Sequence, residues 1–296
     1  MTRDYYNRRS GAGGERPRLT LPEMAGNIAG AYRFILERGY LQRSFGYYCV
    51  DGGEVPGRDG NGINEALLLA TGVRAPTLLE DLIRDADEAV VFTIVEFVFD
   101  HLAKPLENTG RYHPFNNCGW HYDSADPRFF DEPAARGEWR AKINGALKFY
   151  EDGFELSEAG EVVRLAPDGV TELVRAPLPA TLQRTDAEKV AHAIRTFHLG
   201  RATREERKQA VRSLFDILEF HRATVKALLS KDEGELFNIA NNFSIRHHRA
   251  TEKDEYDEAW LTWMFYVNLS TVHLVLRRVH GASSTDHEAR PGKVVL

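Results

Sequence analysis

Residues 257–280, DEAWLTWMFYVNLSTVHLVLRRVH, form the stretch of sequence on which the fold prediction rests. Its apolar residues recur at helical spacing and occupy almost every side of a helix: Trp260, Trp263, Met264, Val267, Val272, Leu274 and Val275. A helix that is apolar almost all round is normally surrounded by other helices. We therefore predict that this segment is the central helix of a bundle.

Three more helices are predicted before this segment, over residues 186–199, 203–230 and 231–248. The longest of them carries an apolar stripe at Val211, Leu214, Leu218, His221, Val225 and Leu228. Gly200 and Gly281 stand where helices commonly end. Residues 186–281 therefore predict a four-helix bundle, followed by a loose tail over residues 282–296.

The N-terminal half is also predicted to be helical, with one exception. Periodicity favours helices over residues 21–39, 64–70, 85–104 and 132–150. Residues 154–176 instead contain short β-favouring runs separated by glycine-containing turns, which predict an antiparallel hairpin or a three-strand meander. The fold class is therefore mainly α, with a helical N-terminal region over residues 21–178.

Two segments without regular structure complete the predicted organisation. Residues 1–20 are rich in Arg and Gly with few apolar anchors, which is typical of a disordered arm. Residues 176–180, APLPA, are a proline-containing linker between the halves. The chain therefore divides into an arm, an N-terminal region, a bundle and a tail.

Composition excludes several classes of protein. The chain has 296 residues, 43% apolar residues and a net charge of −6, as in an ordinary globular protein and unlike a generic nucleic-acid coat. Two cysteines cannot form a disulfide framework. The N-terminus lacks an apolar signal region, and residues 89–99, the most apolar run, are too short to span a membrane. We therefore expect a cytoplasmic protein without membrane contact.

The segment FNIANNFSIRHHR, residues 237–249, carries the candidate functional side chains. On a helix, Asn238, Asn242, Arg246 and Arg249 lie on successive turns of one face. His247 and His248 follow Arg246 at the helix end, where protonated imidazole is favoured. Such a face could bind phosphate and move protons. The alternative is that the amides satisfy backbone groups and the basic residues only neutralise the helix end.

Two histidines on other helices are possible supporting residues. His273 shares a polar stripe with Tyr266, Ser270 and Arg277 on the last helix. His221 lies on the apolar stripe of the long preceding helix. A single histidine on an apolar face is more often a hydrogen-bonded core residue, and that alternative stays open for both.

A metal site is a further hypothesis, because His113, Cys118 and His121 are all acceptable zinc ligands. Their spacing matches no strong structural-zinc pattern, and a fourth ligand would have to be Asp123, Asp126 or a distant histidine. The chain also lacks the common phosphate-loop, metalloprotease, nucleophile-elbow and dinucleotide motifs. We therefore expect neither a metal nor a cofactor.

The C-terminal segments FNIANNFSIRHH and YDEAWLTWMFYVNLSTVHLVLRR resemble the HEPN superfamily, and in particular helical domains of AbiJ-type bacterial abortive-infection proteins. The resemblance covers about residues 186–281. Many HEPN proteins are metal-independent ribonucleases completed across a dimer. The resemblance implies that Arg246 holds the scissile phosphate, that His247 or His248 moves the proton, and that Asn242 supports them.

The chain departs from that family in the spacing of its motif. HEPN nucleases place His five to seven positions after Arg, and no arginine here is followed by His at that spacing. The resemblance therefore predicts an RNA-directed protein of a phage-defence system, either a ribonuclease or a protein that only binds RNA. It also predicts that the chain forms a homodimer. The alternative is a non-catalytic interaction module that dimerises or binds a partner protein or a nucleotide.

Overall fold

The computed structural model describes residues 18–60, 62–75, 78–107, 109–167, 169–179, 184–242 and 257–281. The chain divides into two compact units, and the division falls between Leu165 and Ala166. Helices predominate in both, and the described strands form only two-stranded antiparallel sheets, so the mainly α prediction is confirmed. The boundary precedes the linker predicted near residue 177, because Leu173 and Val174 pack on the core of the second unit.

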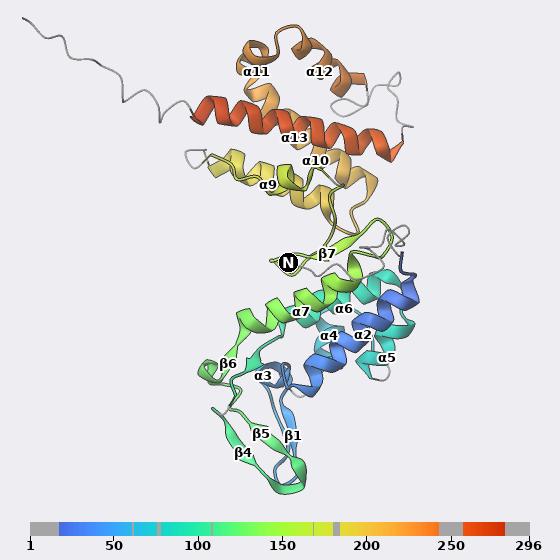
Figure 1. Cartoon of the computed structure of the whole chain (residues 1–296), viewed down its shortest axis with the longest axis vertical. Helices are drawn as coiled ribbons and strands as arrows, with labels where there is room; N and C mark the ends of the chain where they lie inside the picture. The colour runs from blue at the N-terminus through green and yellow to red at the C-terminus, as the bar shows by residue number, and fades with distance from the viewer. Residues whose placement is uncertain are drawn as a thin grey trace, which may run out of the picture. The chain divides into compact units, whose positions relative to one another are not determined.

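Five helices build the core of the first unit: α2 (Leu21–Glu37), α4 (Ile63–Thr71), α5 (Leu79–Asp85), α6 (Glu88–Asp100) and α7 (Glu132–Leu147). α2 packs against α5 and α7, as Figure 1 shows. Trp139 of α7 is fully buried, and its indole N–H donates to the carbonyl oxygen of Val95 on α6 at 3.2 Å. This contact joins two helices of the core by packing and by a hydrogen bond.

Local capping explains where these helices begin. The Thr20 and Glu23 side chains form a capping box at the start of α2. The Asp87 carboxylate accepts from the Val90 N–H at 2.9 Å, so α6 begins after Asp87 rather than at 85. Leu19 pairs with Tyr150 in an isolated bridge, so the end of the predicted arm is attached to the core. Residues 1–17 of that arm lie outside the described residues.

The predicted hairpin is present, but it is shorter than expected. β7 (Phe154–Leu156) pairs with β8 (Val162–Arg164). The run VTELV, which the meander alternative assigned to a third strand, is instead the short helix α8 (Thr171–Arg175). Leu173 and Val174 pack on helices of the second unit, so tertiary contacts outweigh the β-propensity of the run.

Three further sheets were not predicted. They are β1 (Tyr47–Cys49) with β2 (Gly53–Val55), β3 (Lys104–Pro105) with β6 (Phe130–Asp131), and β4 (Arg111–His113) with β5 (Gly119–His121). The 3-10 turn η1 (Phe115–Asn117) lies between β4 and β5, and η2 (Pro127–Phe129) directly precedes β6. The short helix α3 (Gln42–Phe45) precedes β1. Each strand has two or three residues, too few to give an alternating pattern in the sequence.

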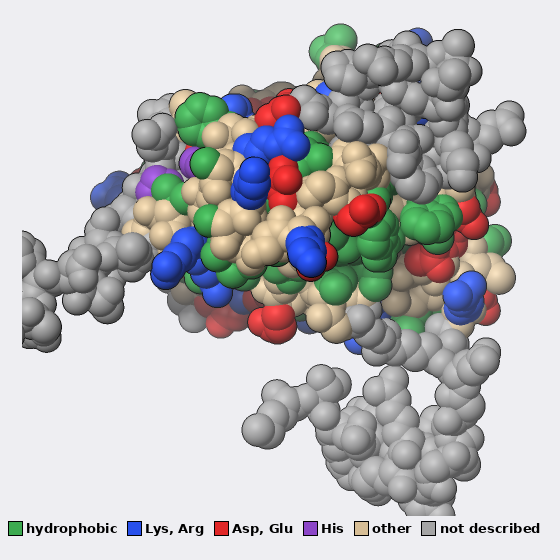
Figure 2. Space-filling view, turned by 90° about the horizontal axis from the view of Figure 1, so that it is seen from above, with side chains coloured by type: hydrophobic (Ala, Val, Ile, Leu, Met, Phe, Trp, Pro, Cys, Tyr) green, Lys and Arg blue, Asp and Glu red, His purple; other side chains and the backbone are tan. Residues whose placement is uncertain are grey.

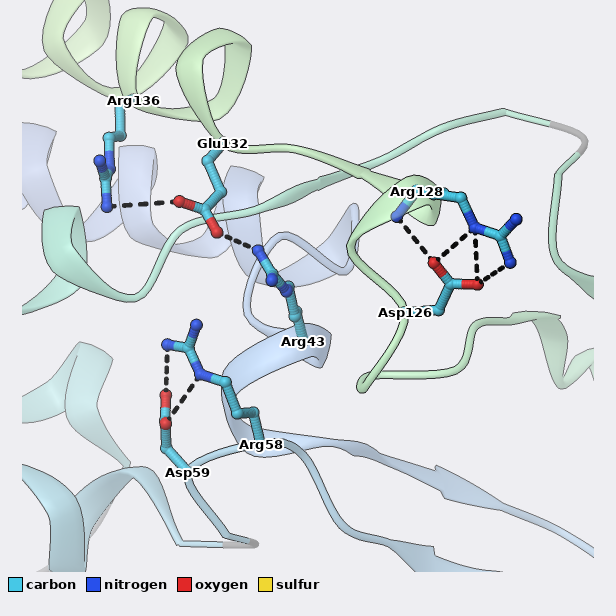
Figure 3. A network of polar contacts seen from close by, with 7 residues as sticks. All are labelled: Arg43, Arg58, Asp59, Asp126, Arg128, Glu132 and Arg136. Atoms are coloured by element: carbon cyan, nitrogen blue, oxygen red, sulfur yellow. Dashed lines mark hydrogen bonds and ion pairs between the residues drawn. The ribbon is translucent and has the colours of Figure 1, made fainter.

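Ion pairs hold the segments from which these hairpins emerge. Figure 3 shows Glu132, at the start of α7, between Arg43 of α3 and Arg136 of the same helix. Just after β2, the Arg58 guanidinium group donates two hydrogen bonds to the Asp59 carboxylate. The hydrogen bonds from Arg128 lower the pKa of Asp126 to about 2, which keeps this carboxylate ionised.

The second unit is a helical assembly around its last helix. It contains α9 (Arg184–His198), α10 (Arg204–Phe220), α11 (Arg222–Leu229), α12 (Asp232–Asn242) and α13 (Glu258–Gly281). The helix predicted over residues 203–230 is broken at His221, which ends α10 and precedes α11. The break lets α11 contact both α12 and α13. The described residues between 184 and 281 therefore hold five helices, where four were expected over residues 186–281.

α13 has the central position predicted for it. Its buried residues include Leu261, Phe265, Leu269 and Leu276, and it packs against α10 and α11. It is also the one helix among the described residues that is long and apolar enough to cross a membrane, but 56% of the relevant window is buried inside the unit. Its apolar character is therefore largely explained by the core that it forms. The predicted tail, residues 282–296, lies outside the described residues.

One face of the molecule carries mixed charge. On the face drawn in Figure 2, Lys and Arg side chains lie beside Asp and Glu side chains and between hydrophobic ones. Such mixing is ordinary for a soluble globular protein.

Candidate metal centre

Two of the unpredicted hairpins, β1–β2 and β4–β5, lie beside each other (Figure 1), and both contribute side chains to one cluster. Alternate residues of a strand point to opposite faces, so Tyr47 and Cys49 share one face of β1. His113 and His121 likewise share one face of the β4–β5 hairpin, where Arg111 pairs with His121 and His113 pairs with Gly119. The centroids of the Tyr47 and His121 rings are 4.5 Å apart, so these faces of the two hairpins are in contact.

The β1–β2 hairpin is held by a close crossing of two glycines. Gly46 has φ +74°, and a Cβ there would collide with the Val55 carbonyl oxygen. A Cβ on Gly57 would collide with the backbone of Ser44 and Gly46. Only glycine allows this approach, which sets the direction in which β1 carries Cys49 away from α3.

A tight turn brings Cys118 back to His113. The turn η1 contains Asn116 with φ +47°, a conformation that asparagine tolerates better than most residues. The Cys118 N–H donates to the Phe115 carbonyl oxygen at 3.0 Å. The chain therefore reverses within four residues of His113, and Cys118 and His121 return on the inner face.

These hairpins bring four metal-ligating side chains together. Ligand atoms of Cys49, His113, Cys118 and His121 all lie within 4.8 Å of one another. The Cys118 Sγ and His121 Nε2 atoms are 3.1 Å apart. Tetrahedral zinc with usual Zn–S and Zn–N distances places its ligand atoms about 3.3–3.8 Å apart, so a small closing movement would suffice. The donors therefore fit a Cys2His2 zinc site.

His113 and Cys49 each have a polar contact of the kind found beside zinc ligands. The His113 Nε2 atom lies 2.9 Å from the Asp51 carboxylate, and its Nδ1 atom is buried without a partner among the described residues. A carboxylate on the distal nitrogen is the usual companion of a zinc-bound histidine. The Gly52 nitrogen lies 3.4 Å from Cys49 Sγ and can donate a hydrogen bond to it.

The electrostatics at His121 favour the form that binds a metal. Burial, followed by the nearby His113 and Arg111, lowers the pKa of His121. A lowered pKa keeps the imidazole neutral to lower pH, and only the neutral ring can act as a ligand. Cys118 is half-buried and Cys49 is buried, so the site lies near the surface but is largely covered.

Sequence analysis identified three of these four residues and missed Cys49. The fourth position is filled neither by Asp123 nor by Asp126: the Asp123 carboxylate accepts from the Ala125 N–H, and Asp126 pairs with Arg128. Cys49 lies far from His113 in the sequence, so no short motif contains both. The one available signal was that the chain has only two cysteines and that one of them already belonged to the candidate set.

The residues predicted to act on RNA lie partly within and partly outside the residues that the structure describes. Arg246, His247, His248 and Arg249 lie outside the described residues. Asn238 is exposed on α12, and Asn242 is the last residue of that helix. His273 is buried on α13, and neither of its ring nitrogens has a partner among the described residues. Burial lowers the pKa of His273, which favours its neutral form.

His221 and Tyr266 have local partners in the second unit. His221 Nε2 lies 3.3 Å from the Asp186 carboxylate, at the break between α10 and α11. The Tyr266 hydroxyl lies 3.4 Å from His198 Nε2. These contacts agree with the interpretation of His221 as a hydrogen-bonded structural residue.

No protein-family model, curated protein or solved structure matches this chain. The case for a function therefore rests on the residues themselves, and the donor set of the two hairpins is the most specific chemistry that the described part of the chain presents.

Proposed function

We propose that this chain is a zinc-binding protein in which Cys49, His113, Cys118 and His121 hold one Zn²⁺ between two hairpins. The observation that carries the proposal is the convergence of these four donors within 4.8 Å from two separate hairpins. Thiolate and imidazole donors together favour zinc over magnesium or calcium, which take oxygen ligands.

The donor number indicates a structural role. Four protein ligands complete the usual zinc coordination and leave no position for water or substrate. The two hairpins also need support, because each strand has only three residues and an isolated two-stranded hairpin is marginally stable. The small apolar cluster beside them contains only Ala103, Tyr122 and Phe130 as buried members. Bound zinc would supply the stabilisation that this cluster cannot.

The test is the metal content of the full chain, purified without chelators from zinc-supplied cells. We expect about one zinc ion per chain after gel filtration. Protein that holds far less zinc, and does not take it up after reduction and incubation with zinc salt, would overturn the proposal.

A second candidate function is the RNA-directed role in phage defence, carried out in the cytoplasm. Its support is the cluster of Arg246, His247 and His248 in the sequence and the all-helical second unit, whose helix α12 ends at Asn242 just before it. In this proposal Arg246 holds phosphate and a following histidine moves the proton, with a homodimer as the working form.

For this candidate, we expect induced wild-type protein to arrest growth and degrade RNA, and Arg246→Ala/His247→Ala to do neither at equal soluble expression. The matched control is His192→Ala/Arg201→Ala, which removes an exposed histidine and arginine elsewhere in the second unit. Growth rate and total RNA on a gel are the measurements. Intact RNA with the wild type, also during phage challenge, would refute the candidate.

A further inference from the structure

The four-residue cluster contains both cysteines of the chain. Cys49 and Cys118 come from different hairpins, and both are free thiols in this structure. Their Sγ atoms lie within 4.8 Å of each other. A disulfide needs its two sulfur atoms about 2.05 Å apart, so a closing movement of under about 3 Å would join them. The sequence holds no third cysteine that could compete for either sulfur.

The two cysteines differ in exposure, and this difference assigns them different roles in an oxidation. Cys118 lies between η1 and β5 and is half-buried, so a small polar oxidant can reach its sulfur. Cys49 is only 8% exposed. Oxidation-sensitive cysteines are typically accessible and lie beside a second cysteine that reacts with the first oxidation product. Cys118 therefore fits the residue that meets the oxidant, and Cys49 fits its partner.

We propose, on the basis of the zinc site above, that Cys118 is a site of oxidation by hydrogen peroxide, and that the oxidation ends in a Cys49–Cys118 disulfide with release of the metal. Cysteines that ligate zinc are thiolates, and the thiolate is the nucleophilic form. The Cys118 sulfur attacks one peroxide oxygen, so that an S–O bond forms, the O–O bond breaks and the other oxygen leaves as hydroxide.

The second step joins the two cysteines. The Cys49 thiolate attacks the sulfenic sulfur of Cys118, so that the S–S bond forms, the S–O bond breaks and a second hydroxide leaves. Each hydroxide takes one proton from the solvent. One hydrogen peroxide is thereby reduced to two molecules of water, and the two thiolates are oxidised to one disulfide.

The reaction removes both sulfur ligands from the site and keeps the two hairpins connected. His113 and His121 alone leave the zinc coordination incomplete, so the metal is released. The disulfide links β1 to the residue that precedes β5, in place of the link through the metal. A dithiol reductant returns both cysteines to thiols, so the site can bind zinc again.

The first experiment treats the zinc-loaded full chain with hydrogen peroxide. A zinc-binding dye measures the released metal, and peptide mass spectrometry without reduction locates the oxidised sulfur atoms. We expect about one zinc ion to be released per chain, together with a Cys49–Cys118 disulfide within the chain. Dithiothreitol followed by zinc salt should restore the site. Zinc that stays bound, or Cys118 sulfinate without a disulfide, overturns the proposal.

Tyr48→Ser is the matched control for this experiment. Tyr48 lies beside Cys49 on β1 but is 69% exposed, so this variant should release zinc and form the disulfide as the wild type does.

The second experiment separates the roles of the two cysteines in zinc-free protein. In Cys49→Ser, a sulfenic acid on Cys118 has no partner, so dimedone, which reacts with sulfenic acids, should label Cys118 at least about 10-fold more than in the wild type. Cys118→Ser should show little label, because Cys49 is buried. Equal labelling of the remaining cysteine in the two variants would overturn the assignment of Cys118 as the oxidised residue.

These results are distinct from those that test zinc binding itself. A chain that binds no zinc but forms the Cys49–Cys118 disulfide would refute the zinc site and support the oxidation site. A chain that holds zinc and forms no disulfide under peroxide would support the zinc site and refute the oxidation site.

Discussion

Cys49→Ser is expected to leave the purified chain without stoichiometric zinc. Cys49 supplies one of four donors and is the only one on the β1–β2 hairpin, so its loss disconnects that hairpin from the metal. We expect the zinc affinity to fall by more than about 100-fold, because changing even a residue that only orients a ligand costs about 10–100-fold. Competition with a zinc-binding dye measures this affinity.

A neighbour on the same strand is the matched control for this variant. Tyr48 is 69% exposed and points away from the cluster, so Tyr48→Ser should keep its zinc. Asp51→Asn should give an intermediate result, a loss of about 10–100-fold, because the carboxylate contacts His113 rather than the metal. Full zinc occupancy in Cys49→Ser would remove the β1–β2 hairpin from the proposed centre.

Trp139→Ala is expected to destabilise the first unit by about 3–5 kcal/mol, the usual cost of removing a large buried aromatic side chain. Trp139 is fully buried, and its truncation also leaves the Val95 carbonyl oxygen without its indole donor. Trp139→Phe keeps most of the volume and loses the donor, and it should cost about 1–3 kcal/mol.

Urea unfolding followed by circular dichroism measures both variants. Because the chain has two compact units with separate cores, the transition of the first unit should move to lower urea while that of the second, built around Phe215 and Phe265, should not. A free-energy change below about 1 kcal/mol for Trp139→Ala would show that the contact between α6 and α7 is not central to the core.

The helices of this protein are readable from its sequence because the signals that form them are local. The spacing of apolar residues predicted α2, α6, α7 and α13 to within a few residues. The β7–β8 hairpin rests on a similarly short pattern. The local signals did not predict the break at His221, because the apolar stripe continues there without a glycine or proline to interrupt it.

The candidate zinc centre shows the opposite case. Three of its residues lie within nine positions of one another and are acceptable zinc ligands, but they match no zinc pattern, and the sequence led us to expect no metal. Cys49 completes the set only because Gly46 and Gly57 cross closely and direct β1 toward the second hairpin. No spacing rule includes such a contact, since it depends on how the backbone passes over a distant segment.

The exposed face of α13 depends on tertiary structure in the same way. Its sequence alone predicts an apolar surface almost all round, and thus full burial. The core of the second unit buries Leu261, Phe265 and Leu269 and leaves Trp260, Trp263 and Leu274 exposed. Helix formation follows from neighbouring residues, whereas the ligand set and the exposed face of α13 follow from which distant segments pack together. That packing is decided only when the core has formed.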